Sequence, residues 1–240
     1  MQGDLCYCFA FEIDVFVMEE KKINKLNRTF ARRIGKTLTD INKSAIENDL
    51  PKVLYTPEKL ESTRYKKVFF EIGYGMGEHF VNQLKNNPDN LYIGAEVYIN
   101  GVAGALKKLK DYDGDNYLLW PDDLDAMLEQ MPNNSLDGIY VLFPDPWHKR
   151  RYLKKRLFNT ERVALFKQKL KPGGFVSFAS DIADYFDSTK LILEQDIDFQ
   201  ISGNDFLNPH AGYVQTKYHS KAIEEGRVAQ FITALYKTIT

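Results

Sequence analysis

The segment "VLFPDPWHKRRYLKKR", residues 141–156, combines a carboxylate, an aromatic ring and dense positive charge. Asp145 stands between Pro144 and Pro146, directly after a run of apolar residues, and Trp147 follows. Each proline fixes its own φ angle and lacks an N–H donor, which lowers the entropy lost when the carboxylate is held in one place. The Trp ring offers a face on which a base can stack. The segment predicts either a proline-braced surface turn or the edge of an active site for a polyanion.

Positive charge is concentrated in two segments of the chain. Residues 21–36 carry seven of the 32 basic residues and residues 149–156 carry six, with no acid in either segment. The other 19 basic residues are outnumbered by 33 acidic ones, although the whole chain has a net charge of only −1. Clustered Lys and Arg side chains neutralise phosphates and supply affinity without reading base sequence. The two segments predict a nucleic-acid interface, with solvated helix surfaces as the alternative.

A second chemical feature is the glycine-rich turn in "EIGYGMGEHF", where Glu71 precedes Gly73, Gly75 and Gly77. Glycines let the backbone turn sharply and let a ligand approach closely. A dinucleotide site would have its third glycine where Glu78 stands, and a carboxylate there opposes a pyrophosphate at a helix N-terminus. An acid ahead of the loop instead suits a ligand with positive charge. We therefore predict an S-adenosylmethionine site, with an NAD site or a purely structural turn as alternatives.

The elements that must position these residues are visible from about residue 66 onward. The runs "KVFFEIG", "LYIGAE", "NYLLW", "GIYVLF" and "GFVSFAS" are apolar without clean alternation, as in parallel strands buried on both faces. The stretches between them that are compatible with helices are residues 78–86, 98–111, 123–131, 157–170 and 182–195. Strand and helix alternate five times, which predicts an α/β fold with a doubly wound, mostly parallel sheet. The tail "RVAQFITALYKT" alternates more and predicts a last, antiparallel strand at the edge of the sheet.

Acidic residues follow each of the five expected parallel strands. They are Glu71, Glu96, Asp122, Asp145 and Asp181. Ligands of such sheets bind beyond the carboxyl ends of the strands, so we expect these acids at one edge. Glu96 can accept hydrogen bonds from two ribose hydroxyls, and Asp122 or the adjacent Asp123 can accept from an adenine amino group. Asp145 follows the strand expected beside the first one, which places it near the transferable methyl group.

Length and composition point to one α/β domain at residues 66–240, preceded by a basic arm at residues 18–65. Residues 1–17 read as an over-long start or an extension. No apolar run approaches the roughly 18 residues of a membrane span, and Glu12 and Asp14 interrupt the most apolar N-terminal stretch, which makes it a poor signal peptide.

Cysteine and histidine usage gives two further expectations. The only two cysteines, Cys6 and Cys8, lie too close together for a disulfide scaffold or a zinc site, which indicates a cytoplasmic protein. The four histidines, at positions 79, 148, 210 and 219, show no metal-ligand spacing, and we expect no metal.

The motifs "EIGYGMG", "GAEV", "FPDPWHKRRYLKKR", "SDIADY" and "TKYHSKAIEEG" together resemble the tRNA (guanine-N7)-methyltransferases, from about residue 28 to the end. The resemblance implies a Rossmann-like class I methyltransferase that uses S-adenosylmethionine on a variable-loop guanine of tRNA, giving 7-methylguanosine at tRNA position 46, as a monomer or homodimer. A protein partner is left open.

Matched residue by residue, the resemblance implies a role for each motif. Cofactor contacts fall on Glu71, the loop glycines Gly73, Gly75 and Gly77, Glu96, Asp122 and Asp145, and the catalytic position falls on Asp145. Contacts to tRNA fall on Lys149, Asp181 and the segment Thr216, Lys217, Tyr218 and His219. The family usually has Glu where His219 stands, and a neutral His accepts a hydrogen bond from guanine with one nitrogen only.

Guanine N7 carries a lone pair and no proton, so its methylation requires alignment and no general base. Asp145 could stabilise the positive charge that develops on the base, or accept from guanine N1–H and the 2-amino group. Two alternatives stay open. Exocyclic-amine and amide methyltransferases have an Asn/Asp-Pro-Pro-aromatic segment similar to "PDPW", and an RNA-binding module without activity could have the same fold. The intact glycine loop with its acids argues against the second.

Overall fold

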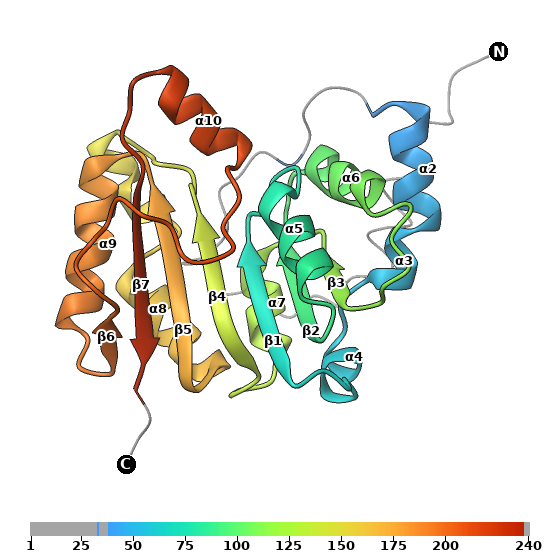
Figure 1. The fold of residues 1–240 in the computed structure, drawn as a ribbon, viewed down its shortest axis with the longest axis horizontal. Helices are drawn as coiled ribbons and strands as arrows, with labels where there is room; N and C mark the ends of the chain where they lie inside the picture. The colour runs from blue at the N-terminus through green and yellow to red at the C-terminus, as the bar shows by residue number, and fades with distance from the viewer. Residues whose placement is uncertain (1–32, 34–37, 238–240) are drawn as a thin grey trace.

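The apolar runs of the sequence form the strands of one mixed sheet in the computed structural model, which describes residue 33 and residues 38–237 (Figure 1). In sheet order the strands are β3 (Tyr117–Trp120), β2 (Asn90–Ala95), β1 (Lys67–Ile72), β4 (Leu136–Leu142), β5 (Leu170–Ser180), β7 (Gln230–Tyr236) and β6 (Phe199–Ile201). The first five of these are parallel, and β7 runs antiparallel to both β5 and β6. The predicted doubly wound sheet with an antiparallel last strand is therefore confirmed.

One detail of the predicted sheet is wrong. The tail was expected at the edge, but β7 lies between β5 and the three-residue strand β6, which is the edge strand. Strand β6 was missed because its residues make no apolar run, and it pairs only where the following β7 offers a free edge.

Helices cover both faces of the sheet. The helices are α2 (Asp40–Asn48), α3 (Leu50–Val53), α4 (Pro57–Glu61), α5 (Glu78–Asn86), α6 (Ile99–Lys108), α7 (Leu124–Gln130), α8 (Thr160–Lys169), α9 (Ala183–Gln195) and α10 (Lys217–Glu224), with a 3-10 helix η1 (Arg150–Lys155). Buried side chains of α7, α8 and α9 pack on one face, and those of α5, α6 and α2 pack on the other (Figure 1). Among the described residues, none of these helices has the length and apolar character needed to cross a membrane.

No helix of the described residues lies over part of the second face. The segment between β6 and α10 crosses in front of β7, β5 and β4 instead, where Tyr213 packs against Tyr140 and Phe231 (Figure 1). This segment leads directly to α10, which begins where the side chain of Thr216 accepts a hydrogen bond from the His219 N–H at 3.2 Å. The fold thus carries residues far apart in sequence to the carboxyl end of the sheet.

The N-terminal region is described only in part. Residues 1–17 and most of the basic segment 21–36 lie outside the described residues. Within residues 38–65, Ile46 and Leu50 are buried against α5 and α6, so these helices pack on the sheet domain.

Candidate active site at the carboxyl ends of the strands

The glycine loop follows β1 and has a backbone that only glycine adopts readily. Gly73, Gly75 and Gly77 have φ angles of 71°, 57° and 79°. A Cβ atom at Gly73 would meet no atom within 4 Å, so the loop is open on that side. Gly77 is the N-cap of α5, and its N–H donates to the Tyr74 carbonyl at 2.9 Å. The loop therefore forms an open backbone cradle between β1 and α5.

Glu96 fixes this cradle from the end of β2. Its carboxylate accepts hydrogen bonds from the Gly75 N–H at 2.7 Å and from the Tyr98 N–H at 2.8 Å. Burial raises the pKa of Glu96, these two N–H donors oppose the rise, and Asp145 adds to it by charge repulsion. Gly101 on α6 packs so closely that a Cβ there would lie 2.4 Å from the Gly75 carbonyl oxygen. Glu96 thus joins the glycine loop to the start of α6.

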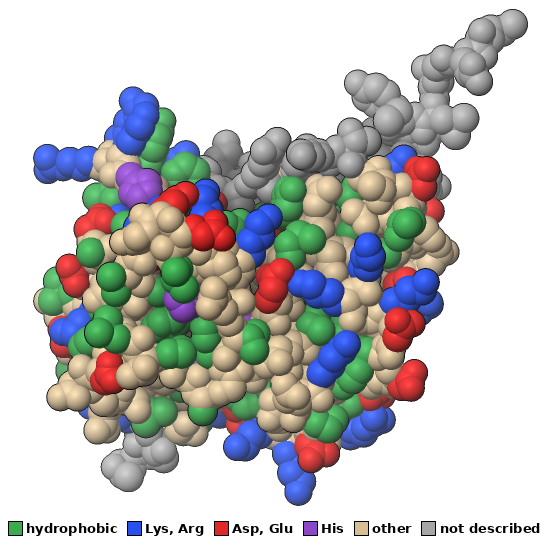
Figure 2. All heavy atoms as spheres, turned by 45° about the horizontal axis from the view of Figure 1, so that its top comes forward, with side chains coloured by type: hydrophobic (Ala, Val, Ile, Leu, Met, Phe, Trp, Pro, Cys, Tyr) green, Lys and Arg blue, Asp and Glu red, His purple; other side chains and the backbone are tan. Residues whose placement is uncertain are grey.

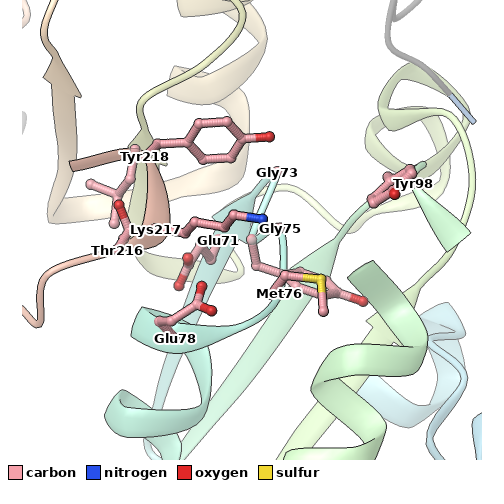
Figure 3. Close-up of a pocket in the computed structure, with 11 residues that line it drawn as sticks. Glu71, Gly73, Gly75, Met76, Glu78, Tyr98, Thr216, Lys217 and Tyr218 are labelled. Carbon is pink, nitrogen blue, oxygen red and sulfur yellow. The ribbon is translucent and has the colours of Figure 1, made fainter. Parts of the chain in front are cut away.

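A pocket opens over the glycine loop and combines predicted residues from both ends of the chain. It is lined by Glu71, Gly73, Tyr74, Gly75, Met76, Glu78, Tyr98, Leu142, Thr216, Lys217 and Tyr218. In Figure 3 the Lys217 side chain reaches across from α10 toward the loop, and the carboxylates of Glu71 and Glu78 lie below it. The structure therefore brings the predicted cofactor loop and the predicted tRNA segment together.

Two of the pocket acids have partners that the sequence did not indicate. Glu71 is buried and its Oε2 lies 2.7 Å from Nδ1 of the fully buried His79. Glu78 pairs with Lys108 at 2.8 Å, so the charge that argued against a pyrophosphate is locally neutralised. The i, i+4 spacing of His79 and Gln83 on α5 predicts that these two side chains meet, but no sequence signal pairs His79 with Glu71 or Lys108 with Glu78.

Asp145 lies on a strained turn after β4, beside the cradle. Phe143 and Trp147 have φ angles of 52° and 44°, which non-glycine residues rarely adopt. The Asp145 side chain is exposed, yet enough protein surrounds its carboxylate that desolvation raises its pKa. Since β4 pairs directly with β1, Asp145 follows the strand beside the one that carries Glu71, as predicted.

The basic residues after Trp147 differ in their exposure to solvent. Lys149, Arg150, Arg151 and Lys154 are exposed, and Figure 2 shows Lys and Arg side chains protruding from this end of the molecule. Lys155 lies 4.8 Å above the Trp147 ring.

Arg156 corrects the prediction that all six basic residues face tRNA. It is buried, pairs with Asp184 at 2.6 Å and donates from Nε to the Pro146 carbonyl at 3.0 Å. It therefore braces the turn that carries Asp145.

The remaining predicted residues lie around the pocket and are not in its lining. Asp122 pairs with Arg33 at 2.8 Å and keeps a side chain 29% exposed. Asp123 is buried, and its side chain caps α7, so Asp122 is the more exposed of the two acids. Asp181 accepts from Nε of Arg227 at 2.6 Å, a partner that nothing in the sequence pointed to.

His219 points back into the fold. Its ring stacks on Phe143 at 5.4 Å, and its Nδ1 lies 2.9 Å from the Tyr213 hydroxyl. The Thr216 N–H donates to the same hydroxyl at 3.5 Å. Burial lowers the pKa of His219, which favours the neutral ring. The Nδ1 atom of His219 is therefore engaged within the protein.

Within the described ranges, no three His, Cys, Asp or Glu side chains gather as metal ligands would. The described lining of the pocket offers carboxylates, glycine backbone, Lys217 and the aromatic rings of Tyr74, Tyr98 and Tyr218.

Comparison with known proteins identifies the family of this chain. Residues 65–232 match the family described as "Putative methyltransferase". The chain is 52% identical to a "Bifunctional methyltransferase" of Rickettsia typhi over 90% of its own length, but it spans only 42% of that relative. It is 34% identical to a "tRNA (guanine-N(7)-)-methyltransferase" of Azorhizobium caulinodans, covering 85% of this chain and 93% of that protein.

A solved structure of similar fold is the 16S rRNA methyltransferase KamB, with a TM-score of 0.57 at 16% identity, over 75% of this chain and 92% of that one. At this identity the likeness concerns the fold alone. The matched family covers most of the chain, and the Azorhizobium relative is matched over nearly its whole length. The chain therefore belongs to the tRNA (guanine-N(7)-)-methyltransferase family.

Proposed function

We propose that this chain methylates N7 of guanine 46 in the variable loop of tRNA, with S-adenosylmethionine as the methyl donor. The observation that carries the proposal is one pocket in which the open glycine cradle faces Thr216, Lys217 and Tyr218 of α10. The relatives named for this activity support the choice of base and substrate. The Rickettsia typhi relative is more than twice as long as this chain. The activity stated here is therefore proposed for whatever protein contains this chain.

The residues of the pocket fit the proposed cofactor. The cradle has room where a Cβ at Gly73 would stand, so a ligand can approach the backbone. Glu71 and Glu96 supply negative charge next to it, which suits the ammonium and sulfonium groups of S-adenosylmethionine. Each Glu96 oxygen accepts one backbone hydrogen bond and retains a second lone pair for a ribose hydroxyl. Asp122 is the acid that we assign to the adenine end. When bound, this cofactor supplies an activated methyl group.

Asp145 has the position and environment for the developing charge. Methylation turns the neutral guanine ring into a cation, and a carboxylate in a partly desolvated site stabilises such a charge more than it would in water. No base is needed, because N7 has no proton to lose. We assign Asp145 to orientation of the guanine and electrostatic stabilisation, with Pro146 and Arg156 holding the turn in place.

The other side of the pocket would hold tRNA. Exposed Lys149, Arg150, Arg151 and Lys154 can neutralise phosphates, and Trp147 with Lys155 offers a stacking surface beside them. We assign Asp181 to the substrate side through its pair with Arg227. His219, in contrast, is assigned to bracing Phe143 and not to guanine. With tRNA as the substrate, we also propose that the protein works in the cytoplasm.

The test is methyl transfer from labelled S-adenosylmethionine to unmodified tRNA, followed by nucleoside analysis. Label in 7-methylguanosine is the expected result. Label in an N-methylated exocyclic amine would move the enzyme to the class that has an Asn/Asp-Pro-Pro-aromatic segment at this place. Binding of cofactor and tRNA without any transfer would support the RNA-binding alternative.

A further inference from the structure

A chain of buried and partly buried polar side chains runs from β7 to Glu71 of the pocket, and the proposed chemistry uses only Glu71. We call it the histidine chain: Thr233, Ser177, His210, His79 and Glu71. Successive contacts measure 3.3 Å between the two hydroxyls, 3.3 Å from Ser177 to His210 Nδ1, 3.0 Å between the two Nε2 atoms and 2.7 Å from His79 Nδ1 to Glu71 Oε2. His79, Ser177 and Glu71 are buried, and a polar chain at such depth is costly unless each member is paired.

The tautomer of His79 follows from a neighbour on its own helix. The amide nitrogen of Gln83 donates to the Gly212 carbonyl at 2.8 Å and also lies 3.1 Å from His79 Nε2. An amide nitrogen is a donor only, so His79 Nε2 is an acceptor and its ring hydrogen is on Nδ1. His79 Nδ1 therefore donates to the Glu71 carboxylate.

The rest of the chain then has one consistent direction. Burial lowers the pKa of His210, so its ring is neutral and has one hydrogen. His79 Nε2 has one lone pair, which the Gln83 amide and the His210 Nε2–H then share. His210 accepts at Nδ1 from the Ser177 hydroxyl, which in turn accepts from Thr233. Every donor points toward Glu71. Chains aligned in this way polarise one another, which strengthens the last bond.

The chain also joins two walls of the pocket. Glu71 lines the cofactor side of the pocket, and Thr216 and Lys217 line the other side (Figure 3). His210 and Gly212 belong to the segment that leads into Thr216. His79 and Gln83 of α5 hold this segment from behind, at His210 and at the Gly212 carbonyl.

We infer that His79 and His210 are positioning residues, which turn the Glu71 carboxylate toward the cofactor and seat the segment before α10 against the same pocket. This rests on the proposed function for the identity of the cofactor. With Oε2 of Glu71 held from behind, Oε1 is the oxygen presented to the ligand.

The direct test is nitrogen-15 NMR of the histidine rings in the wild-type chain, which separates ring nitrogens with and without hydrogen. We expect the Nδ1–H tautomer for His79 and the Nε2–H tautomer for His210. An Nε2–H tautomer at His79 would reverse the chain and overturn the inference. This measurement needs no variant and therefore does not depend on how a variant folds.

The binding test compares three variants by calorimetry with S-adenosylmethionine. His79→Leu should raise the Kd by roughly tenfold or more, since it removes a hydrogen bond to a carboxylate. His79→Asn keeps an N–H near the Nδ1 position and should stay within about threefold of wild type. Phe175→Leu thins the packing around Tyr140 in the same cluster without touching the chain, and should lower the Tm but not raise the Kd.

The outcomes separate this inference from the proposed function. Equal Kd values for His79→Leu and wild type would refute the positioning role even if tRNA were methylated normally. The expected Kd pattern in a chain that leaves tRNA unmethylated would keep the positioning role and reject the proposed reaction.

Discussion

The substitution Gly101→Ala tests whether the close approach of α6 to the glycine loop sets cofactor affinity. The new Cβ would lie 2.4 Å from the Gly75 carbonyl oxygen, where ordinary contact begins at 3.4 Å, so loop and helix must separate by about 1 Å. A shift of that size stretches the 2.7 Å bond from the Gly75 N–H to Glu96 beyond hydrogen-bonding range.

The magnitude follows from these contacts. Loss of a hydrogen bond to a carboxylate costs about 1.5–3 kcal/mol, and overpacking costs about 1–3 kcal/mol. Alanine recovers about 1 kcal/mol over glycine within a helix. We therefore expect a folded protein whose Kd for S-adenosylmethionine, measured by calorimetry, rises roughly tenfold or more.

The matched control is Gly104→Ala on the same helix. Its Cβ would meet the Met76 methyl carbon at 2.4 Å, which is the free end of a flexible side chain and can move aside. Its helix propensity gain is the same, and although Met76 also lines the pocket, no backbone has to move, so its Kd should rise clearly less than that of Gly101→Ala. An unchanged Kd for Gly101→Ala, with the Tm preserved, would show that the loop and α6 do not hold the cofactor.

Three further substitutions test separate parts of the site and fold. Asp145→Asn should lower kcat by about 10²-fold in single-turnover methyl transfer while the cofactor Kd changes little, because the charge acts on the developing cation. Replacing Arg150 and Lys154 with Gln should make the salt dependence of tRNA binding less steep, by roughly 1.5–2 in the slope of log K against log salt. Burial raises the pKa of Asp125 to about 6 despite its partner Arg162, so the folded state holds this proton more tightly than the unfolded state does. Stability relative to Asp125→Asn should therefore be greatest below pH 4 and decline as the pH rises through about 6, as measured by denaturant unfolding.

Each of these has a result that would count against it. A wild-type kcat for Asp145→Asn removes this carboxylate from the reaction. An unchanged salt slope makes the basic run an ordinary solvated surface. A flat difference in unfolding free energy between pH 4 and 7 would mean that Asp125 titrates normally in the fold.

The strands and helices of the core could be predicted because their signals are local. Five apolar runs became β1 to β5, and the helix between the first two was placed at the residues where α5 begins and ends. The position of Asp145 beside β1 followed from the rules of parallel sheets, not from any single residue.

The parts that escaped prediction depend on contacts between distant residues. His79 meets His210 across 131 positions, and Arg227 meets Asp181 across 46. From the sequence, Arg156 was predicted to contact phosphate, but in the fold it donates to the Pro146 carbonyl and pairs with Asp184. Charge and spacing show which residues are polar, but only the tertiary fold decides which of them point inward.

The measurement that tests the central claim most directly uses tRNA transcripts with either guanine or 7-deazaguanine at the variable-loop position. Replacing N7 by carbon removes the proposed acceptor and leaves the exocyclic amine and the rest of the base intact. We predict label from S-adenosylmethionine in the guanine transcript and none in the 7-deazaguanine transcript, with equal binding of both. Equal labelling of the two transcripts would contradict the account, because the methyl group would then be on an atom other than N7.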